Sequence, residues 1–259
     1  MKNIFKISYL IILLLTVTPQ VNAAEKVELL KTEWSFKGLF GKFDRGSLQR
    51  GYQVYTEVCS SCHSMKYLSY RNLAEKGGPE FSEEQVKAIA ANFEVTDGPN
   101  NDGEMFTRAA KLSDKFVMPY ANVKAAQAAN GGAYPPDMSV LAKARSGGVD
   151  YIYSVLLGYE DPPNGMTLDE GVYYNKFMYG NNIKMSQPLS DGLVEYSDGT
   201  IASEEQMAKD VATFLMWAAE PHLEARHQMG FKAIVYLIIL TVLVYFSMKR
   251  IWSRVETEV

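Results

Sequence analysis

The sequence predicts a mainly α-helical domain with long loops, followed by one C-terminal transmembrane helix. Three features of the 259 residues support this fold class. Segments 45–58 and 203–220 carry apolar residues at helical spacing, and residues 229–248 are almost entirely apolar. Residues 159–200 contain many Gly, Pro and Asn residues and show little periodicity. Long irregular segments of this kind in a compact domain tend to be functional.

The two helical segments are expected to pack against each other. The apolar stripe of the first consists of Leu48, Gly51, Tyr55 and Val58. Gly51 would allow a second helix to approach closely, because it has no side chain. The partner is expected to be segment 203–220, where Ser203 and Gln206 fit a capping box. The apolar side of this second helix consists of Val211, Phe214, Leu215 and Trp217.

The C-terminal apolar run is long enough to cross a membrane. It contains 20 residues, interrupted by Lys232, and a spanning helix needs roughly 20. Lys249 and Arg250 follow directly, as is typical of a cytoplasmic flank. A buried core helix is the alternative, but the terminal position and the basic stop argue against it. The expected organisation is an exported domain at 24–228, a span at 229–248 and a cytoplasmic tail at 249–259.

The N-terminus has the pattern of a secretory signal peptide at 1–23. Lys2 and Lys6 precede an apolar run of about 11 residues, and Ala23 ends a small-residue site. The predicted cleavage follows Ala23, or alternatively Ala24. A retained anchor is the other interpretation, but the run is too short for a spanning helix.

The charge of the chain limits the class of its partners. The net charge is −4, and it becomes −6 without the first 23 residues, which hold two lysines and no acid. This balance disfavours nucleic acid and favours a basic protein partner.

The two cysteines of the chain lie in Cys59-Ser60-Ser61-Cys62-His63. This is the attachment signature of c-type haem. Two thiols at this spacing can add to the two vinyl groups on one edge of a porphyrin. The histidine that follows then faces the iron as its first axial ligand. The motif therefore predicts one covalently bound haem c.

Other uses of this motif fit less well. A thioredoxin-like pair should follow a strand, whereas a helical segment precedes Cys59. A zinc site would need four ligands, and the other histidines, His222 and His227, lie beside the apolar C-terminal run.

The second axial ligand is expected to be a methionine, because histidine is nearly excluded by position. From the residues alone, Met185 and Met118 are the leading alternatives. Met118 precedes Pro119, and Met185 lies in an irregular segment three residues before Pro188. A methionine can also simply fill a gap in a core. The full set of candidates is Met105, Met118, Met138, Met166, Met178 and Met185.

The sequence resembles the cytochrome c1 family of bacterial type. Cytochrome c1 is the haem subunit of the ubiquinol–cytochrome c oxidoreductase, or cytochrome bc1, complex. The resemblance extends along nearly the whole expected mature chain, and its order and spacing are specific. Its motifs include Arg50-Gly51-Tyr52-Gln53-Val54-Tyr55, Gly103-Glu104-Met105-Phe106, Ala144-Arg145-Ser146-Gly147-Gly148 and Ala218-Ala219-Glu220-Pro221.

The resemblance implies a class I cytochrome c-like haem domain and assigns roles within it. It implies His63 and Met185, rather than Met118, as the axial ligands. It also implies that Pro135 and Pro136 wall the haem, that Arg145 faces a haem propionate, and that Asn130 and Tyr151 lie nearby. From the residues alone, Arg145 could equally be a solvated charge at a helix end. Some family members carry a further cysteine pair, which this chain lacks.

The function implied is electron transfer within a membrane complex. The expected donor is a Rieske iron–sulfur protein, the acceptor is a soluble or tethered cytochrome c, and the span would pack on cytochrome b. The expected location is the inner membrane, with the haem domain in the periplasm. The chain itself would supply no catalytic acid or base. A stand-alone tethered cytochrome shuttle is the main alternative, and a haem sensor with an open iron site is another.

Acidic residues in two predicted loops could steer a basic cytochrome c. Solvated loops that aid solubility are the alternative interpretation. The two groups are Glu94, Asp97, Asp102 and Glu104, and Glu160, Asp161, Asp169 and Glu170.

Overall fold

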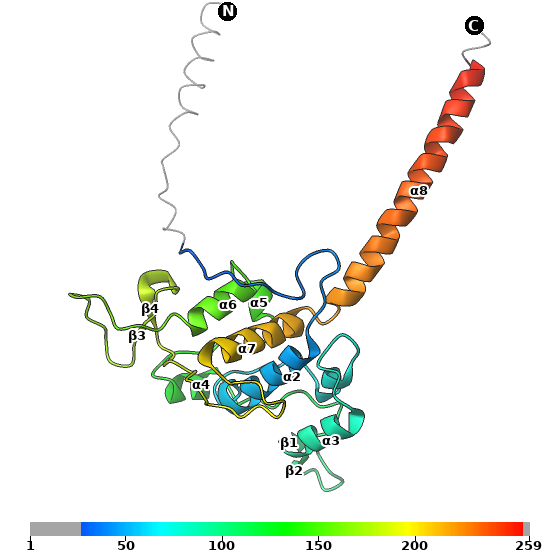
Figure 1. Cartoon of the computed structure of the whole chain (residues 1–259). Coiled ribbons are helices and arrows are strands. Elements are labelled where there is room, and N and C mark those ends of the chain that lie inside the picture. Colours follow the sequence, from blue (N-terminus) through cyan, green and yellow to red (C-terminus); the bar gives the residue numbers. More distant parts are fainter. Residues whose placement is uncertain (1–26, 256–259) are drawn as a thin grey trace, which may run out of the picture.

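A computed structural model describes residues 27–255, so the predicted signal peptide lies outside the described residues. Figure 1 shows a helical domain from which one long helix projects. Labels follow Figure 1. The helices are α2 (Arg45–Val54), α3 (Glu83–Ala91), α4 (Val123–Ala129), α5 (Leu141–Ala144), α6 (Val149–Leu156), α7 (Glu204–Ala219) and α8 (Leu223–Val255), with a π-helix at Tyr55–Cys59 and 3-10 helices at Tyr70–Ala74 and Tyr179–Asn181.

The expected mainly α fold class is confirmed. The strands of the described residues form two short antiparallel pairs, β1 (Glu94–Asp97) with β2 (Phe106–Ala109), and β3 (Tyr173–Tyr174) with β4 (Asn182–Ile183). The hairpin of β1 and β2 was not expected, because the acidic residues from Glu94 onward were predicted to lie in a loop. Four residues are too few for alternation to distinguish a strand from a loop.

Helix α2 leads directly into the haem motif. Asp44 caps its N-terminus, where the carboxylate accepts a hydrogen bond from the Ser47 N–H at 2.7 Å. Beyond Val54 the backbone widens into the π-helix that ends at Cys59. Such wide turns occur frequently at functional sites. Of the predicted stripe, Leu48, Gly51 and Tyr55 are buried and Val58 is partly buried.

Helix α7 begins as predicted, but its capping box is only half formed. The Ser203 hydroxyl accepts a hydrogen bond from the Gln206 N–H at 3.2 Å. The Gln206 side chain was expected to reach back to Ser203. It donates instead to the Asp210 carboxylate at 3.0 Å. The prediction was wrong on this half because the buried carboxylate of Asp210 also needs hydrogen-bond donors.

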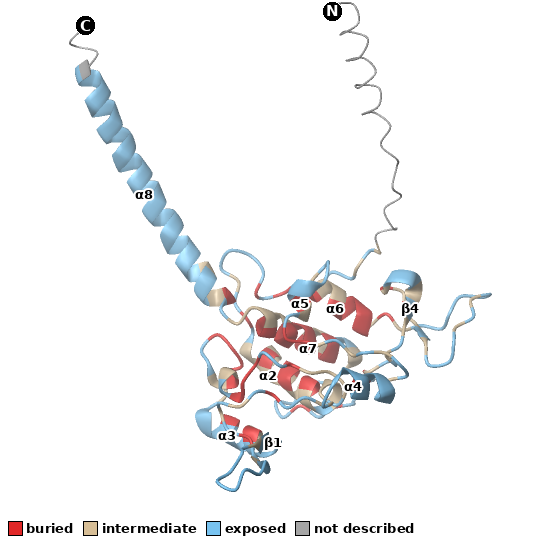
Figure 2. Cartoon of the chain, turned by 180° about the vertical axis from the view of Figure 1, so that it is seen from behind, coloured by how far each residue is buried: buried red, intermediate tan, exposed pale blue. Residues whose placement is uncertain are grey.

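Helices α2 and α7 lie side by side in the core, as predicted (Figures 1 and 2). A Cβ atom on Gly51 would lie 2.1 Å from the Asp210 carbonyl oxygen and 2.7 Å from the Phe214 Cβ. Only glycine therefore permits this approach. Phe214 also packs on Tyr52, with ring centroids 5.8 Å apart, and on Trp217 at 5.4 Å. These rings supply much of the hydrophobic contact between the helices.

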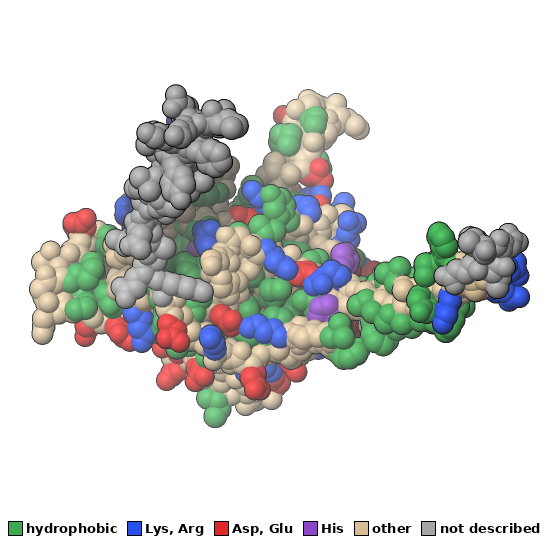
Figure 3. Space-filling model, turned by 90° about the horizontal axis from the view of Figure 1, so that it is seen from above, with side chains coloured by type: hydrophobic (Ala, Val, Ile, Leu, Met, Phe, Trp, Pro, Cys, Tyr) green, Lys and Arg blue, Asp and Glu red, His purple; other side chains and the backbone are tan. Residues whose placement is uncertain are grey.

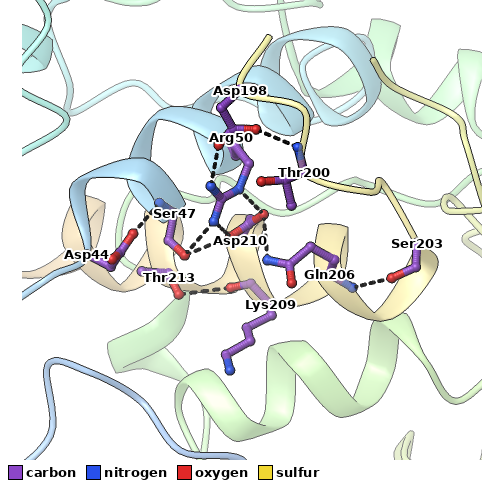
Figure 4. A network of polar contacts seen from close by, with 10 residues as sticks. All are labelled: Asp44, Ser47, Arg50, Asp198, Thr200, Ser203, Gln206, Lys209, Asp210 and Thr213. Atoms are coloured by element: carbon purple, nitrogen blue, oxygen red, sulfur yellow. Dashed lines mark hydrogen bonds and ion pairs between the residues drawn. The ribbon is translucent and has the colours of Figure 1, made fainter. Parts of the chain in front are cut away.

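A buried ion pair lies beside the crossing of α2 and α7 (Figure 4). The Asp210 side chain has no exposed surface, and Arg50 donates to it from Nε at 2.8 Å and from a terminal nitrogen at 3.2 Å. The Ser47 hydroxyl adds a third donor at 2.7 Å. Arg50 also reaches the exposed Asp198 at 2.6 Å. Asp210 is thus well provided with donors, as a buried carboxylate must be.

Helix α8 leaves the domain and is exposed along nearly its whole length (Figure 2). It contains the predicted span 229–248, but begins earlier and continues through most of the expected tail. At 33 residues it is about 50 Å long, more than the roughly 30 Å hydrocarbon core of a bilayer. By length and composition it is a candidate membrane span.

Two substitutions at the Arg50 pairs should have very different effects on stability. Asp210→Ala leaves the Arg50 guanidinium largely buried without its main partner, so we expect a loss of about 3–5 kcal/mol. Asp198→Ala removes a partner of the same arginine at the surface, and should lower stability far less. Urea unfolding of the full chain in detergent, followed by circular dichroism, measures both. Equal losses would contradict the assignment of Asp210 as the main partner.

Candidate haem attachment site

The haem motif forms a tight turn at the end of the π-helix. Cys59 is its last residue, and the Cys59 carbonyl accepts hydrogen bonds from the Cys62 N–H at 3.1 Å and the His63 N–H at 2.9 Å. Both cysteines are free and partly buried. Burial, with the nearby Cys62, raises the pKa of the Cys59 thiol to about 12. Two free thiols and an imidazole are presented together, as thioether attachment requires.

The orientation of His63 suits an iron ligand. Its Nδ1 lies 2.9 Å from the Pro136 carbonyl oxygen. Because a carbonyl can only accept, Nδ1 carries the proton and Nε2 keeps its lone pair. Burial lowers the pKa of His63, against the effect of this hydrogen bond. The neutral imidazole needed for ligation is thus favoured, and the residues fit a c-type haem.

Asp137 fixes the segment that holds His63. Its carboxylate accepts hydrogen bonds from the Ser64 hydroxyl at 2.8 Å, the Lys66 N–H at 3.0 Å and the Ser139 N–H at 3.0 Å. Burial opposes the charge, but these donors outweigh it and hold the pKa of Asp137 below its ordinary value. Pro135 and Pro136 are thereby kept beside the motif.

A tyrosine connects α4 to the second cysteine. The Tyr120 hydroxyl lies 3.8 Å from the Cys62 sulfur, and the Asn130 amide donates to the same hydroxyl at 3.1 Å. Asn130 is the C-terminal cap of α4 and also donates to the Ala126 carbonyl at 2.7 Å. The structure therefore brings the predicted Asn130 into contact with the motif through Tyr120, which sequence reasoning missed.

A buried asparagine anchors the segment that carries Met185. The Asn175 side chain is fully buried, donates to the Val155 carbonyl at 2.7 Å and accepts from the Phe177 N–H at 3.1 Å. Gly158 lies so close that a Cβ on it would be 2.6 Å from the Asn175 amide oxygen. The hairpin of β3 and β4 is thus fixed to the end of α6. No pattern in the sequence distinguishes Asn175 from a loop asparagine.

Two contacts place Met185 near the other site residues. The Tyr159 hydroxyl donates to the Met185 carbonyl at 3.0 Å, and the Lys184 ammonium donates to the Gly131 carbonyl at 3.1 Å. The second contact joins the Met185 segment to the chain just after α4. Tyr159 and Lys184 were not predicted as site residues.

Four of the other five candidate methionines are placed differently, whereas Met166 is partly buried like Met185. The sulfur of Met178 accepts a hydrogen bond from the Tyr151 hydroxyl at 3.0 Å. Met118 is 53% exposed and Met105 is 61% exposed, whereas Met138 is buried in the core. Met185 is partly buried, and within the described residues its sulfur accepts no hydrogen bond. Its thioether is therefore available to a metal.

Two predicted site residues are not joined to the motif by a polar contact. The Tyr151 hydroxyl is directed to Met178. Arg145 is the exposed residue that ends α5, and across residues 27–255 its guanidinium makes no ion pair. An unpaired guanidinium fits both a solvated charge and a partner for a carboxylate ligand.

The crossed helices α2 and α7, the Cys-x-x-Cys-His turn and the fixed imidazole define a class of protein. They are features of a c-type cytochrome domain, here attached to a candidate membrane-spanning helix. The family model described as the cytochrome C1 family matches residues 34–255. The chain belongs to this family, which confirms the expected resemblance and fold.

Curated relatives agree with this placement. The chain is 48% identical over 243 residues to "Cytochrome c1-2, heme protein, mitochondrial" of Solanum tuberosum, covering 94% of this chain and 92% of that protein. It is 46% identical over 246 residues to "Cytochrome c1" of Rhodospirillum rubrum, covering 89% of each. It is also 51% identical over 240 residues to "Cytochrome b/c1" of Bradyrhizobium diazoefficiens, covering 85% of this chain but 35% of that longer protein.

Asp137→Asn should weaken the segment that orients His63. At pH 7 we expect a loss of about 1–2 kcal/mol, because charge-assisted hydrogen bonds become neutral in a partly exposed position. The pKa of Asp137 is lowered by folding. Its stabilisation is therefore present above the ordinary aspartate pKa of about 4 and is lost as the pH falls through the folded value.

Urea unfolding midpoints at neutral and acidic pH test this expectation. The difference between Asp137→Asn and the native chain should shrink as the pH falls below the ordinary aspartate pKa of about 4, and it should vanish only below the folded pKa, where both carry a neutral group. Asp102→Asn, at an exposed hairpin position, is the control and should be nearly neutral in stability. A pH-independent difference would show that the charge of Asp137 does not contribute.

Proposed function

We propose that this chain is the electron-transfer haem subunit of a quinol–cytochrome c oxidoreductase. It would accept one electron from a Rieske iron–sulfur protein and pass it to a cytochrome c. The observation that carries the proposal is the His63 imidazole, whose Nδ1 is held by Pro136 while Nε2 stays free beside two free cysteines. Membership of the cytochrome C1 family supports the same function.

Each site residue has a distinct proposed role. Cys59 and Cys62 would hold the haem through thioethers, and His63 and Met185 would ligate its iron. Pro135 and Pro136 would wall the ring, Asn130 and Tyr151 would lie near it, and Arg145 would pair with a propionate. The haem supplies a one-electron change of iron oxidation state, and a His/Met ligand pair favours a higher potential. The chain itself needs no catalytic acid or base.

The membrane arrangement is part of the same proposal. Residues 1–23 would direct export and be cleaved, residues 24–228 would lie in the periplasm, and 249–259 would face the cytoplasm. Residues 229–248 would cross the inner membrane as a single pass and pack on cytochrome b. The name "Cytochrome b/c1" of the Bradyrhizobium relative supports an association of a cytochrome b with a protein like this one.

An optical experiment tests the proposed function. The tagged chain is purified from its native membranes in a mild detergent, and a dithionite-reduced minus ferricyanide-oxidised spectrum is recorded. Signals of both c-type and b-type haem are expected. A c-type signal alone, under conditions that keep such complexes whole, would instead favour a tethered cytochrome shuttle. Absence of covalent haem would overturn the proposal.

Met185→Ala should remove the second axial ligand. We expect the reduced protein to bind carbon monoxide and its reduction potential to fall, because the thioether that raises the potential is gone. Met118→Ala and Met178→Ala are matched controls, and neither should bind carbon monoxide. The readouts are a carbon monoxide difference spectrum and a potentiometric titration. Carbon monoxide binding by Met118→Ala with none by Met185→Ala would reverse the assignment.

The acidic residues proposed for docking form two separate groups. The first lies on the hairpin of β1 and β2, and the second precedes β3, at a different end of the domain (Figure 1). Asp97 is paired with Arg108 at 2.5 Å, and Glu160 is paired with Lys176, so both are largely neutralised. The second group lies on the segment that leads to Met185. We therefore propose this group as the docking surface for a basic cytochrome c.

Charge removal in each group tests the docking surface. Asp169→Asn with Glu170→Gln should lower the rate of cytochrome c reduction roughly tenfold at low salt and flatten its salt dependence. Asp102→Asn with Glu104→Gln makes the same change of charge on the hairpin and should have a much smaller effect, since charges are screened beyond about 10 Å. Stopped-flow kinetics at several salt concentrations measure both. Unchanged rates and slopes in both variants would exclude docking by these acids.

A further inference from the structure

The base of α8 is surrounded by basic side chains. Figure 3 shows Lys, Arg and His side chains gathered on the face of the domain from which α8 emerges. Several are neutralised within the domain: Arg226 and Lys143 both pair with Glu220, and Arg45 pairs with Glu224. Lys42 and Lys232 make no ion pair within the described part of the chain. These two charges are therefore available to a ligand.

The two lysines line a common cavity of about 190 Å³, which we call the α8 notch. The notch lies between loop 38–42 and the first turns of α8, and its lining is mainly apolar. It is lined by Leu39, Phe40, Lys42, His227, Phe231 and Lys232, among others.

The apolar part of the α8 notch is continuous with the surface of the candidate span. Phe40 is 70% exposed and Leu39 is 55% exposed, although both belong to the domain. The Phe40 ring packs on Phe231 of α8 with centroids 5.6 Å apart. Phe231 lies in the predicted span 229–248. Loop 38–42 therefore extends the lipid-facing apolar surface at the level where α8 would enter the membrane.

The carboxylate in the α8 notch offsets the charge of the lysines only in part, because Glu224 interacts with Lys42 beyond ion-pair distance. Glu224 is bound on both oxygens by Arg45, at 2.8 and 2.9 Å, and it also accepts from the Phe43 N–H at 2.9 Å. Lys232 lies within an apolar run, where a charged side chain requires a partner. No carboxylate fills this role among residues 27–255. The α8 notch thus combines two unpaired cations with an apolar wall.

We propose that the α8 notch binds one anionic phospholipid of the membrane that α8 spans. The phosphate would lie between Lys42 and Lys232, and an acyl chain would run along Phe40 and Phe231. Charge complementarity selects the anionic headgroup, and continuity with the span selects a lipid as the source. The lipid would join the haem domain to the membrane surface and limit the tilt of α8. The proposal requires α8 to span a membrane and does not depend on electron transfer.

Native mass spectrometry of the purified full chain, with its partners retained, tests the proposal. The probe is phosphatidylglycerol in a mild detergent, compared with phosphatidylcholine at the same concentration. One phosphatidylglycerol per chain should be retained in preference to phosphatidylcholine. Lys42→Gln with Lys232→Gln should weaken its retention about 30-fold, which corresponds to about 1 kcal/mol for each lysine near an anionic lipid.

The control makes the same change of charge away from α8. Lys87→Gln with Lys111→Gln should leave phosphatidylglycerol binding unchanged. Equal binding in both double variants, or equal binding of the two lipids, would overturn the proposal. A photoreactive benzoylphenylalanine in place of Phe40 adds an independent test in native membranes. A lipid adduct supports the proposal, whereas an adduct with another protein subunit would show that a protein covers the notch.

Discussion

The close approach of α2 and α7 supports most of the domain. Gly51 leaves room for the Asp210 carbonyl, and the buried Arg50–Asp210 pair joins the two helices beside the crossing. A larger residue at position 51 would not be tolerated, because the space beside Gly51 is occupied by the Asp210 backbone and not by a flexible side chain. Removing one partner of a buried ion pair is strongly destabilising, because the other charge is left buried without compensation. The aromatic rings around Phe214 supply the hydrophobic contact that stabilises this arrangement.

The crossing of α2 and α7 sets the position of the haem attachment site. Since α2 runs through the π-helix to Cys59 without a break, the crossing also sets where the thiols and His63 are presented. Two other parts of the chain then converge on the motif by polar contacts. Asp137 and Pro136 fix the imidazole, while Asn175 and Tyr159 bring the Met185 segment to the same region. Each of these contacts joins residues far apart in the sequence, so the site forms only when the domain has folded.

The two ends of the domain differ in surface chemistry. The acidic segment before β3 lies on the side that carries Met185, where a soluble partner would dock. The basic and apolar base of α8 suits a membrane surface. Glu224 joins α8 to loop 38–42 through Arg45 and the Phe43 N–H, so the haem domain is held firmly at the start of α8. A firm junction of this kind would keep the haem at a constant height above the membrane.

The sequence by itself determined the helical class, the haem motif, the close approach at Gly51, the cap at Ser203 and the long C-terminal helix. These features depend on local spacing or on residue chemistry, which a sequence displays directly. Only the tertiary structure decided which partner each polar group takes. The Gln206 side chain donates to Asp210 instead of Ser203, and Asp97 lies in strand β1 and pairs with Arg108. The sulfur of Met178 accepts a hydrogen bond from Tyr151. Local patterns cannot reveal such choices, because a buried polar group selects among donors and acceptors that only folding brings within reach.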